Sequence, residues 1–184
     1  MLLLCLASFS LFANDKIVKP SSIHISYFHP YFEAGKLRID SQVMFSLSPE
    51  MEQALQHQIP LTFDIEVKLL EQQAFYFERE VKTIHYQIKV LYFNYSHKFI
   101  ISNQRSQANQ SFTSLKDALQ TFGTIRNFKI IDLADLSSDK TYSIAFRVSF
   151  NRWKLPTPLI IDSFLDKSWY LASDWRKMTL PRLE

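Results

Sequence analysis

Glycine is nearly missing from this chain of 184 residues, which contains only Gly35 and Gly123. Phosphate-cradling loops and dinucleotide-binding turns need several closely spaced glycines, because backbone N–H groups must approach the phosphates. The nucleophile elbow of many hydrolases needs a glycine on each side of its serine, in the pattern G-x-S-x-G. Two isolated glycines therefore argue against these three classes of enzyme.

Cysteine is equally scarce, since Cys5 is the only one and lies inside the apolar run of residues 2–13. This run is shorter than the roughly 20 apolar residues of a membrane-spanning helix. It resembles the apolar region of a secretory signal, with small Ala13 before polar residues. We predict a signal peptide at residues 1–13, with a buried N-terminal strand or helix as the alternative. Cleavage would leave no cysteine for thiol catalysis, zinc binding or disulfides.

A strong excess of one charge is also lacking, because 21 basic residues stand against 18 acidic residues along the chain. A nucleic-acid-binding protein usually concentrates Lys and Arg in a stripe or tail, and no such cluster is seen. We therefore expect no nucleic-acid partner. With 47% hydrophobic and 15% aromatic residues, the chain has the composition of a folded protein, and its length predicts one domain over residues 14–184.

Alternation of apolar and polar residues is the dominant pattern. Strands of this kind bury one face and expose the other, as antiparallel sheets do. The long alternating stretches are residues 36–48, 60–70, 83–92 and 141–151, and shorter ones are residues 22–28, 97–102 and 128–132. The polar stretch of residues 102–111 is predicted to be a long hairpin tip or a mobile loop.

Two stretches follow a helical pattern instead. Residues 48–58 begin with Ser48 as a predicted N-cap and Pro49 at the first helical position. Residues 114–123 have apolar side chains at helical spacing, with Gly123 where a C-cap is expected. The fold class predicted is mainly β: a single-domain antiparallel β-sandwich, or a partly open barrel, with two short connecting helices.

Two of the three tryptophans lie in the stretch SWYLASDWRK at residues 168–177. Trp169 and Trp175 are six residues apart, so an extended final strand would place both indoles on one face. Such a face either closes the core of the sandwich or forms a partly exposed aromatic platform for a partner. The sequence leaves both interpretations open.

A second candidate surface begins at Arg152 and Trp153, in the stretch RWKLPTPLII. We expect Pro156 and Pro158 to hold this segment extended and to expose the Arg-Trp pair, a combination that often anchors interfaces. The alternative is a loop that protects a sheet edge. The predicted partner-binding residues are thus Arg152, Trp153, Trp169 and Trp175.

Catalytic and metal-binding patterns are weak. His85 and His97 flank a predicted hairpin, and Glu78 and Glu80 lie two residues apart. No H-E-x-x-H motif occurs, and no serine is paired with a base in the sequence. Catalysis would require the two histidines or the two glutamates to meet in a cleft. We predict a protein that is not an enzyme and binds no metal or cofactor.

The order of the motifs resembles a family of exported bacterial proteins that share domain of unknown function 4390. The resemblance covers nearly the whole mature chain and departs at Gln58, where the family often has glycine. It implies an envelope protein of Gram-negative bacteria, often encoded near a sensor histidine kinase, and implies no activity. The motifs are FSLS, Ala54-Leu55, Ile59-Pro60-Leu61, LYF at residues 91–93, SLKDAL, Tyr142, Leu155-Pro156-x-Pro158-Leu159, and Trp169-x-Leu171-x-Ser173-x-Trp175.

Two functions remain open at this point. The first is a non-catalytic periplasmic module that binds another envelope protein and acts as an accessory to a membrane sensor kinase. The second is a carrier of a small ligand or lipid, which predicts an apolar cavity of at least about 300 Å³ between the sheets. In either case we expect an exported protein with no transmembrane segment after cleavage, or an envelope-associated protein if the N-terminal segment is retained.

Overall fold

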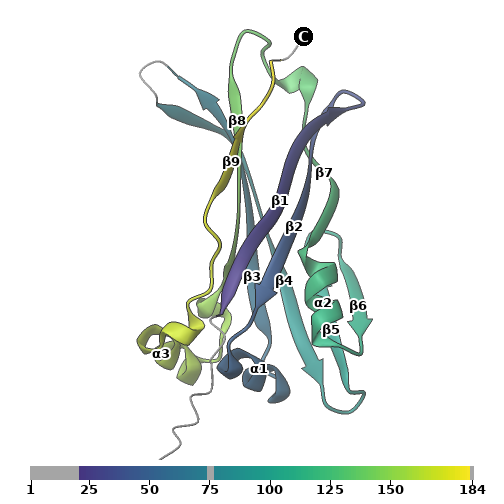
Figure 1. Cartoon of the computed structure of the whole chain (residues 1–184), viewed down its shortest axis with the longest axis vertical. Helices are drawn as coiled ribbons and strands as arrows, with labels where there is room; N and C mark the ends of the chain where they lie inside the picture. The colour runs from purple at the N-terminus through teal and green to yellow at the C-terminus, as the bar shows by residue number, and fades with distance from the viewer. Residues whose placement is uncertain (1–20, 74–76, 183–184) are drawn as a thin grey trace, which may run out of the picture.

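The fold is a sandwich of two antiparallel sheets that lie face to face (Figure 1). It is seen in a computed structural model that describes residues 21–73 and 77–182. The predicted fold class, mainly β with two antiparallel sheets and no closed barrel, is confirmed. The predicted signal peptide at residues 1–13 lies outside the described residues.

The two sheets differ in size. The smaller sheet has the order β1-β2-β7 and the larger has the order β6-β5-β4-β3-β8-β9. The strands of the smaller sheet are β1 (Ser22–Glu33), β2 (Lys36–Ser46) and β7 (Thr124–Asp132). Those of the larger sheet are β3 (Leu61–Gln72), β4 (Glu78–Phe93), β5 (Lys98–Asn103), β6 (Ala108–Phe112), β8 (Tyr142–Phe150) and β9 (Arg176–Thr179).

The core fills the space between the sheets with the apolar side chains that the alternation predicted. In β3 every second residue from Phe63 to Leu69 is almost fully buried. Aromatic rings meet across the sandwich, with centroids about 5.5 Å apart, in a geometry that adds to the stabilisation from burial alone. The pairs are Phe28 with Phe146, Phe45 with Phe63, and Tyr86 with Phe128.

The two predicted helices form where expected. Helix α1 (Pro49–Gln56) is capped by Ser48, whose hydroxyl oxygen accepts the Met51 N–H at 3.2 Å. Helix α2 (Leu115–Gly123) is capped in the same way by Ser114. Each cap satisfies a backbone donor that the first turn leaves free. Helix α2 packs against β2, β5 and β6, and so covers one side of the gap between the sheets (Figure 1).

A third helix, α3 (Thr157–Leu165), occupies the segment that was predicted to be extended. Pro156 is its N-cap residue and Pro158 lies in its first turn. Proline suits this position, because the first turn has no intrahelical partner for its N–H and the ring fixes φ near the helical value. The two prolines therefore start a helix, and the prediction of an extended segment was wrong.

The polar stretch of residues 102–111 is also more regular than predicted. Only residues 104–107 form the hairpin tip, where the Asn103 side-chain oxygen accepts the N–H groups of Arg105 and Ser106. The rest belongs to β5 and to the edge strand β6, which pairs with β5 through its backbone. The side chains of β6 are mostly polar and exposed, so no alternation marked it as a strand.

Gly123 has a different role from the predicted C-cap. It is the last residue of α2, and Thr124 is the cap. A Cβ atom at Gly123 would lie 2.0 Å from the carbonyl oxygen of Val43 in β2. The absence of a side chain therefore allows α2 to end directly against the central strand of the smaller sheet.

We expect Gly123→Ala to lower the free energy of unfolding by about 3 kcal/mol or more, because the added methyl group overlaps a backbone atom that cannot move aside easily. The matched control is Gly35→Ala in the β1–β2 turn, where φ is +70° but no atom lies within 4 Å of the new Cβ. This control should cost about 1–2 kcal/mol from backbone strain alone. Urea denaturation measures both changes, and an equal loss at the two positions would contradict the packing role of Gly123.

Candidate functional site

The four predicted partner-binding residues lie in three different environments. Arg152 and Trp153 form the short 3₁₀ turn before α3, at one end of the sandwich. Trp169 is in the core with 5% of its surface exposed, and its indole packs near Phe150. Trp175 is 40% exposed and lies over the outer face of the larger sheet. The structure therefore brings together only Arg152 and Trp153.

The prediction that both C-terminal indoles share one face of a strand was wrong. Ala172 pairs with Ser149, and Arg176 pairs with Phe146. Between these two pairs the C-terminal segment advances by four residues, whereas β8 advances by only three. One extra residue of this kind is a β-bulge, and it switches the face to which the following side chains point. Trp169 thus points into the core and Trp175 points out.

Because it is buried, Trp169 offers no surface to a partner, so the core interpretation holds for this residue. Trp175 has its ring near two cations, with Lys68 Nζ 5.5 Å and the Arg147 guanidinium carbon 5.7 Å from the ring centroid. Both cations belong to the charged outer face of β3 and β8. The indole covers their aliphatic stems there.

Several large exposed apolar side chains gather around α3. We call this surface the α3 patch and define it by its large exposed side chains. Leu165 is 83% exposed, Trp153 72%, and Ile161 and Tyr170 63% each. Of the nine residues of α3, only Ser163 is fully buried. The members of the α3 patch are Trp153, Ile161, Phe164, Leu165 and Tyr170.

Arg152 holds the α3 patch together. Its guanidinium donates a hydrogen bond of 3.1 Å to the carbonyl oxygen of Ser163, in the last turn of α3. The same group lies over the ring of Phe164, at 4.4 Å from the centroid, and near the ring of Tyr170, at 5.5 Å. A planar guanidinium stacks readily on aromatic faces. Arg152 therefore fixes two rings and the end of the helix in one arrangement.

A small hollow opens beside these rings. Its volume is about 300 Å³, and its walls are Arg152, Phe164, Asp166, Lys167 and Tyr170. On the other side, the ring of Trp153 meets Phe164 with centroids 4.9 Å apart. The α3 patch thus combines protruding apolar side chains with a recess that suits one side chain of a partner. Within residues 21–73 and 77–182, no helix is long and apolar enough to span a membrane.

The candidate catalytic groups do not converge. His85 lies 3.4 Å from Asp64 on the outer face of the larger sheet, whereas His97 is in the turn after β4 and contacts the Tyr92 hydroxyl. Glu78 pairs with Lys177, and Glu80 pairs with Lys68. In the part of the chain that the structure describes, no three His, Cys, Asp or Glu side chains gather as metal ligands.

Glu71 is a carboxylate that the sequence analysis did not single out. Its side chain is only 4% exposed, at the end of β3, and it accepts hydrogen bonds from Lys140, Arg79 and Gln73. The bonds from Lys140 and Arg79 lower the pKa of Glu71 from 4.5 to about 2. The three partners come from separate segments, so the cluster ties together the loops at this end of the larger sheet.

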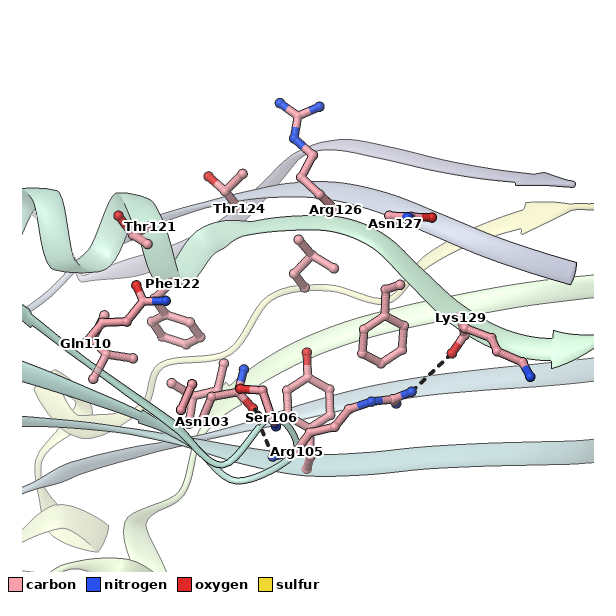
Figure 2. Close-up of a pocket in the computed structure, with 16 residues that line it drawn as sticks. Asn103, Arg105, Ser106, Gln110, Thr121, Phe122, Thr124, Arg126, Asn127 and Lys129 are labelled. Carbon is pink, nitrogen blue, oxygen red and sulfur yellow. Dashed lines mark hydrogen bonds between the residues drawn. The ribbon is translucent and has the colours of Figure 1, made fainter. Parts of the chain in front are cut away.

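A cavity of about 510 Å³ lies between the two sheets, where β7 and α2 face β4, β5 and β6 (Figure 2). Its lining combines apolar side chains, among them Ile88, Phe122 and Phe128, with cations at the rim. A wider hollow of about 860 Å³ lies outside the sandwich, between β2, α1 and α2, with one residue of each charge in its lining, Glu52 and Lys116.

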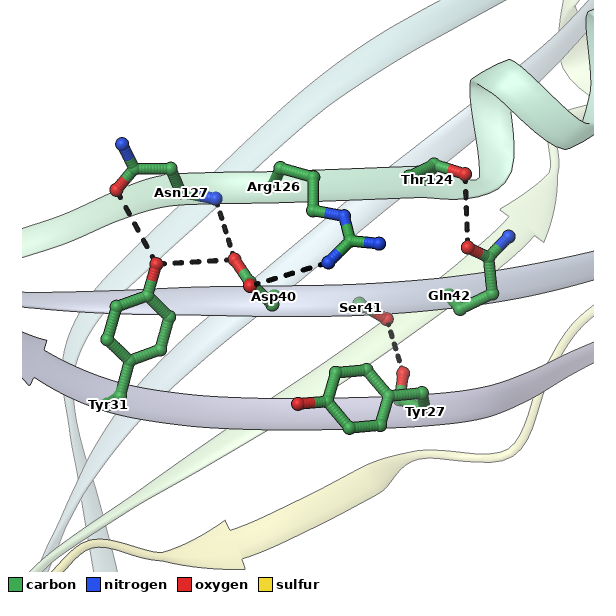
Figure 3. Close-up of polar contacts among 8 residues, drawn as sticks. All are labelled: Tyr27, Tyr31, Asp40, Ser41, Gln42, Thr124, Arg126 and Asn127. Carbon is green, nitrogen blue, oxygen red and sulfur yellow. Dashed lines mark hydrogen bonds and ion pairs between the residues drawn. The ribbon is translucent and has the colours of Figure 1, made fainter.

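A β-bulge in β7 shapes the first cavity. Asn127 has a positive φ of 52°, and the pairing with β2 shifts by one residue at this point. Asp40 of β2 accepts the Asn127 N–H at 2.7 Å and holds the bulge in place, as Figure 3 shows. In a regular strand with Ile125 facing the core, Phe128 would lie three residues later and point away from the core. Because of the bulge, Phe128 instead stacks on Tyr86 of the opposite sheet and forms a wall of the cavity.

Comparison with known proteins gives one match. The model of a family described as a domain of unknown function (DUF4390) matches residues 20–179. No curated protein and no solved structure matches the chain.

The pKa of Glu71 leads to a pH prediction. A carboxyl group with a lowered pKa in the folded state stabilises the fold above its unfolded pKa, and this stabilisation is lost as the pH falls from about 4.5 to about 2. We expect Glu71→Gln to lower the melting temperature at neutral pH and to flatten its decline over this acid range. Thermal unfolding at several pH values measures both effects, and an unchanged acid slope in the variant would contradict the assignment.

Trp169 and Trp153 should differ sharply in their contributions to stability. Trp169→Ala removes a buried indole and should lower the free energy of unfolding by about 3–5 kcal/mol. Trp153→Ala changes an exposed side chain and should cost less than about 1 kcal/mol. Chemical denaturation of the two variants tests this, and similar losses would show that Trp153 is not a surface residue.

Proposed function

The chain belongs to the DUF4390 family, and we propose that it is a non-catalytic protein of the bacterial envelope that binds another envelope protein through the α3 patch. The family match confirms the resemblance seen in the sequence motifs. The single observation that carries the proposal is the apolar helix α3, which exposes most of its side chains.

The composition of the α3 patch is that of a protein interface. Trp, Tyr and Arg are the residues most enriched among those that dominate binding energy, and they act where they meet complementary pockets. Exposed Trp153 and Tyr170 lie beside Arg152, and the hollow of about 300 Å³ next to Phe164 offers such a pocket. Since Arg152 already holds two of the rings in place, little conformational entropy is lost on binding.

The charges favour a protein partner over a lipid surface. Helices that lie on anionic membranes usually have a polar face rich in Lys and Arg. Helix α3 contains no basic residue, and Asp162 is its single charged residue. The hollow is lined by one acidic residue, Asp166, and by two basic residues, Lys167 and Arg152, of which Arg152 is already engaged by the Ser163 carbonyl oxygen and two aromatic rings. A partner with a complementary polar rim fits these features better than an anionic bilayer does.

The proposed location is the periplasm, and the proposed partner is a membrane-bound sensor or another assembly protein of the envelope. The apolar residues 2–13 support export. Strand β1 begins at the end of the sandwich where α1 and α3 lie (Figure 1). The N-terminal segment therefore joins the domain at the same end as the α3 patch, so a retained segment would hold the patch close to a membrane-bound partner.

The proposed role is non-catalytic because the candidate acid, base and metal-binding groups are dispersed. His85 and His97 lie in different parts of β4 and the turn after it, each beside another partner. Glu78 and Glu80 are engaged in separate ion pairs. These positions support a binding role over acid–base catalysis.

A second candidate function, a carrier of a small ligand or lipid, is favoured by the cavity of about 510 Å³ between the sheets. This volume lies within the range of small-molecule sites in proteins. The lining mixes apolar and polar groups, which suits a ligand with both kinds of surface. The two functions use different parts of the molecule.

Site-specific photocrosslinking in bacteria tests the binding proposal. A benzoylphenylalanine in place of Leu165 puts a reactive group on the most exposed member of the α3 patch. We expect one envelope protein to be crosslinked, and we expect Trp153→Ala in the same chain to reduce the adduct by about tenfold, because a central aromatic anchor contributes about 1.4 kcal/mol or more.

The control is Trp175→Ala, which removes a partly exposed indole elsewhere on the protein and should change the adduct by less than about twofold. An equal loss with both variants would contradict a specific role for the α3 patch. If the crosslinked product contained lipid instead of a protein, the α3 patch would bind a membrane surface and the proposed protein partner would be wrong.

A further inference from the structure

We propose that the cavity between the sheets binds an anionic amphiphile, with its carboxylate or phosphate head at Arg105 and Tyr86 and its apolar tail between β4, β5 and β7. This inference rests on the carrier as the second candidate function and adds the class of ligand. It does not depend on the α3 patch.

The floor and walls of the cavity suit an apolar tail. Five apolar side chains line it from both sheets and from α2, so a tail would be enclosed from several sides. Burial of apolar surface is the main source of affinity in such sites. The five residues are Ile88, Ile101, Phe122, Ile125 and Phe128.

Tyr86 provides a hydrogen-bond donor in the part of the site that Arg105 also lines. The residue is 94% buried, with 6% of its surface exposed, and it lines the cavity. Among the described residues, no side chain or backbone group forms a hydrogen bond with its hydroxyl group. The hydrogen of this hydroxyl is therefore available to a ligand oxygen, and such a bond would stabilise the complex. Burial raises the pKa of Tyr86, and the hydroxyl therefore remains a donor at neutral pH.

Arg105 is the cation that is available to the ligand. Its guanidinium lies over the ring of Phe128 at 4.0 Å and donates one hydrogen bond of 3.2 Å to the carbonyl oxygen of Lys129. Figure 2 shows it extended across the mouth of the cavity. A guanidinium has five N–H donors, so several stay free for an anion. No described carboxylate lies within ion-pair distance of Arg105.

The other two cations in the lining are already engaged. Arg126 Nη1 lies 3.9 Å from Asp40 Oδ2, and its side chain points away from the cavity (Figures 2 and 3). Lys129 Nζ lies 2.6 Å from Asp132 Oδ2. No Asp or Glu is among the described residues that line the cavity, so its charge is positive. This asymmetry selects an anionic head over a cationic one.

The charge of the site lies at one end, which Arg105 and Tyr86 line. At the α2 end Phe122 lies beside Gln110 and Thr121, so neutral polar groups border the apolar side chains there (Figure 2). A ligand of matching form has one compact anionic head and a single chain of moderate length, as in a fatty acid or an alkyl phosphate.

Calorimetric titration of the folded protein with decanoate, monodecyl phosphate and decanol tests this inference. We expect saturable binding of the two anions, and we expect Arg105→Gln to weaken it by about tenfold or more, because a charge-assisted hydrogen bond is lost. Tyr86→Phe should weaken it by about threefold to tenfold. NMR signals of the Ile88, Ile101 and Ile125 methyl groups should shift on binding and so locate the tail.

Two further variants act as controls. Arg126→Gln removes a cation that points away from the cavity and should change the affinity by less than about twofold. Ala108→Trp fills the cavity from the exposed strand β6, and should abolish binding of all three ligands. Tighter binding of decanoate would indicate a carboxylate head in the ligand, and tighter binding of monodecyl phosphate would indicate a phosphate head.

Two results would overturn the inference. If decanol bound as tightly as decanoate and Arg105→Gln had no effect, the anionic head would be wrong while the carrier function would stand. If none of the three ligands bound saturably, both the inference and the carrier function would be wrong, and the partner-binding function would be unaffected.

Discussion

The mismatch between a six-stranded and a three-stranded sheet is the constraint on which the rest of the structure depends. Each apolar sheet face must be covered by another layer, and three strands cannot cover six. Helix α2 covers β5 and β6, and helix α1 packs against β4. Gly123 allows α2 to approach β2 closely enough for this. The cover remains incomplete between α2 and β7, and the cavity lies there.

Extra residues in the strands decide which side chains face this space. The bulge of β7 at Asn127 turns Phe128 toward Tyr86, and the bulge before β9 turns Trp175 away from the core. The bulge of β1 near Ser26 is matched by the buried Ser41, whose hydroxyl donates a hydrogen bond of 2.9 Å to the Tyr27 carbonyl (Figure 3). In each case one extra residue reverses the side of the sheet to which the following side chains point.

The α3 patch and the cavity arise from the packing of the sandwich in different ways. The α3 patch exists because α3 lies at the end of the sandwich, where Leu159 and Ile160 pack partly against the core while Ile161, Phe164 and Leu165 remain exposed. The cavity exists because two layers face each other without filling the space between them. An exposed apolar surface favours a macromolecule, whereas a partly open cavity with one cation that no described carboxylate pairs with favours a small ligand.

The sequence by itself determined the main strands, the two capped helices and the sandwich class, because alternation and caps such as Ser48 are local signals. It also identified the family through the order of its motifs. Polar edge strand β6 and the proline-started helix α3 were missed, and the carrier hypothesis predicted a cavity between the sheets without the residues that line it. Only the tertiary structure decided that Trp169 is buried, that Trp175 is partly exposed and that Arg105 and Tyr86 line one cavity. The physical reason is that bulges and strand order join residues far apart in sequence, and neither leaves a periodic signal in the chain.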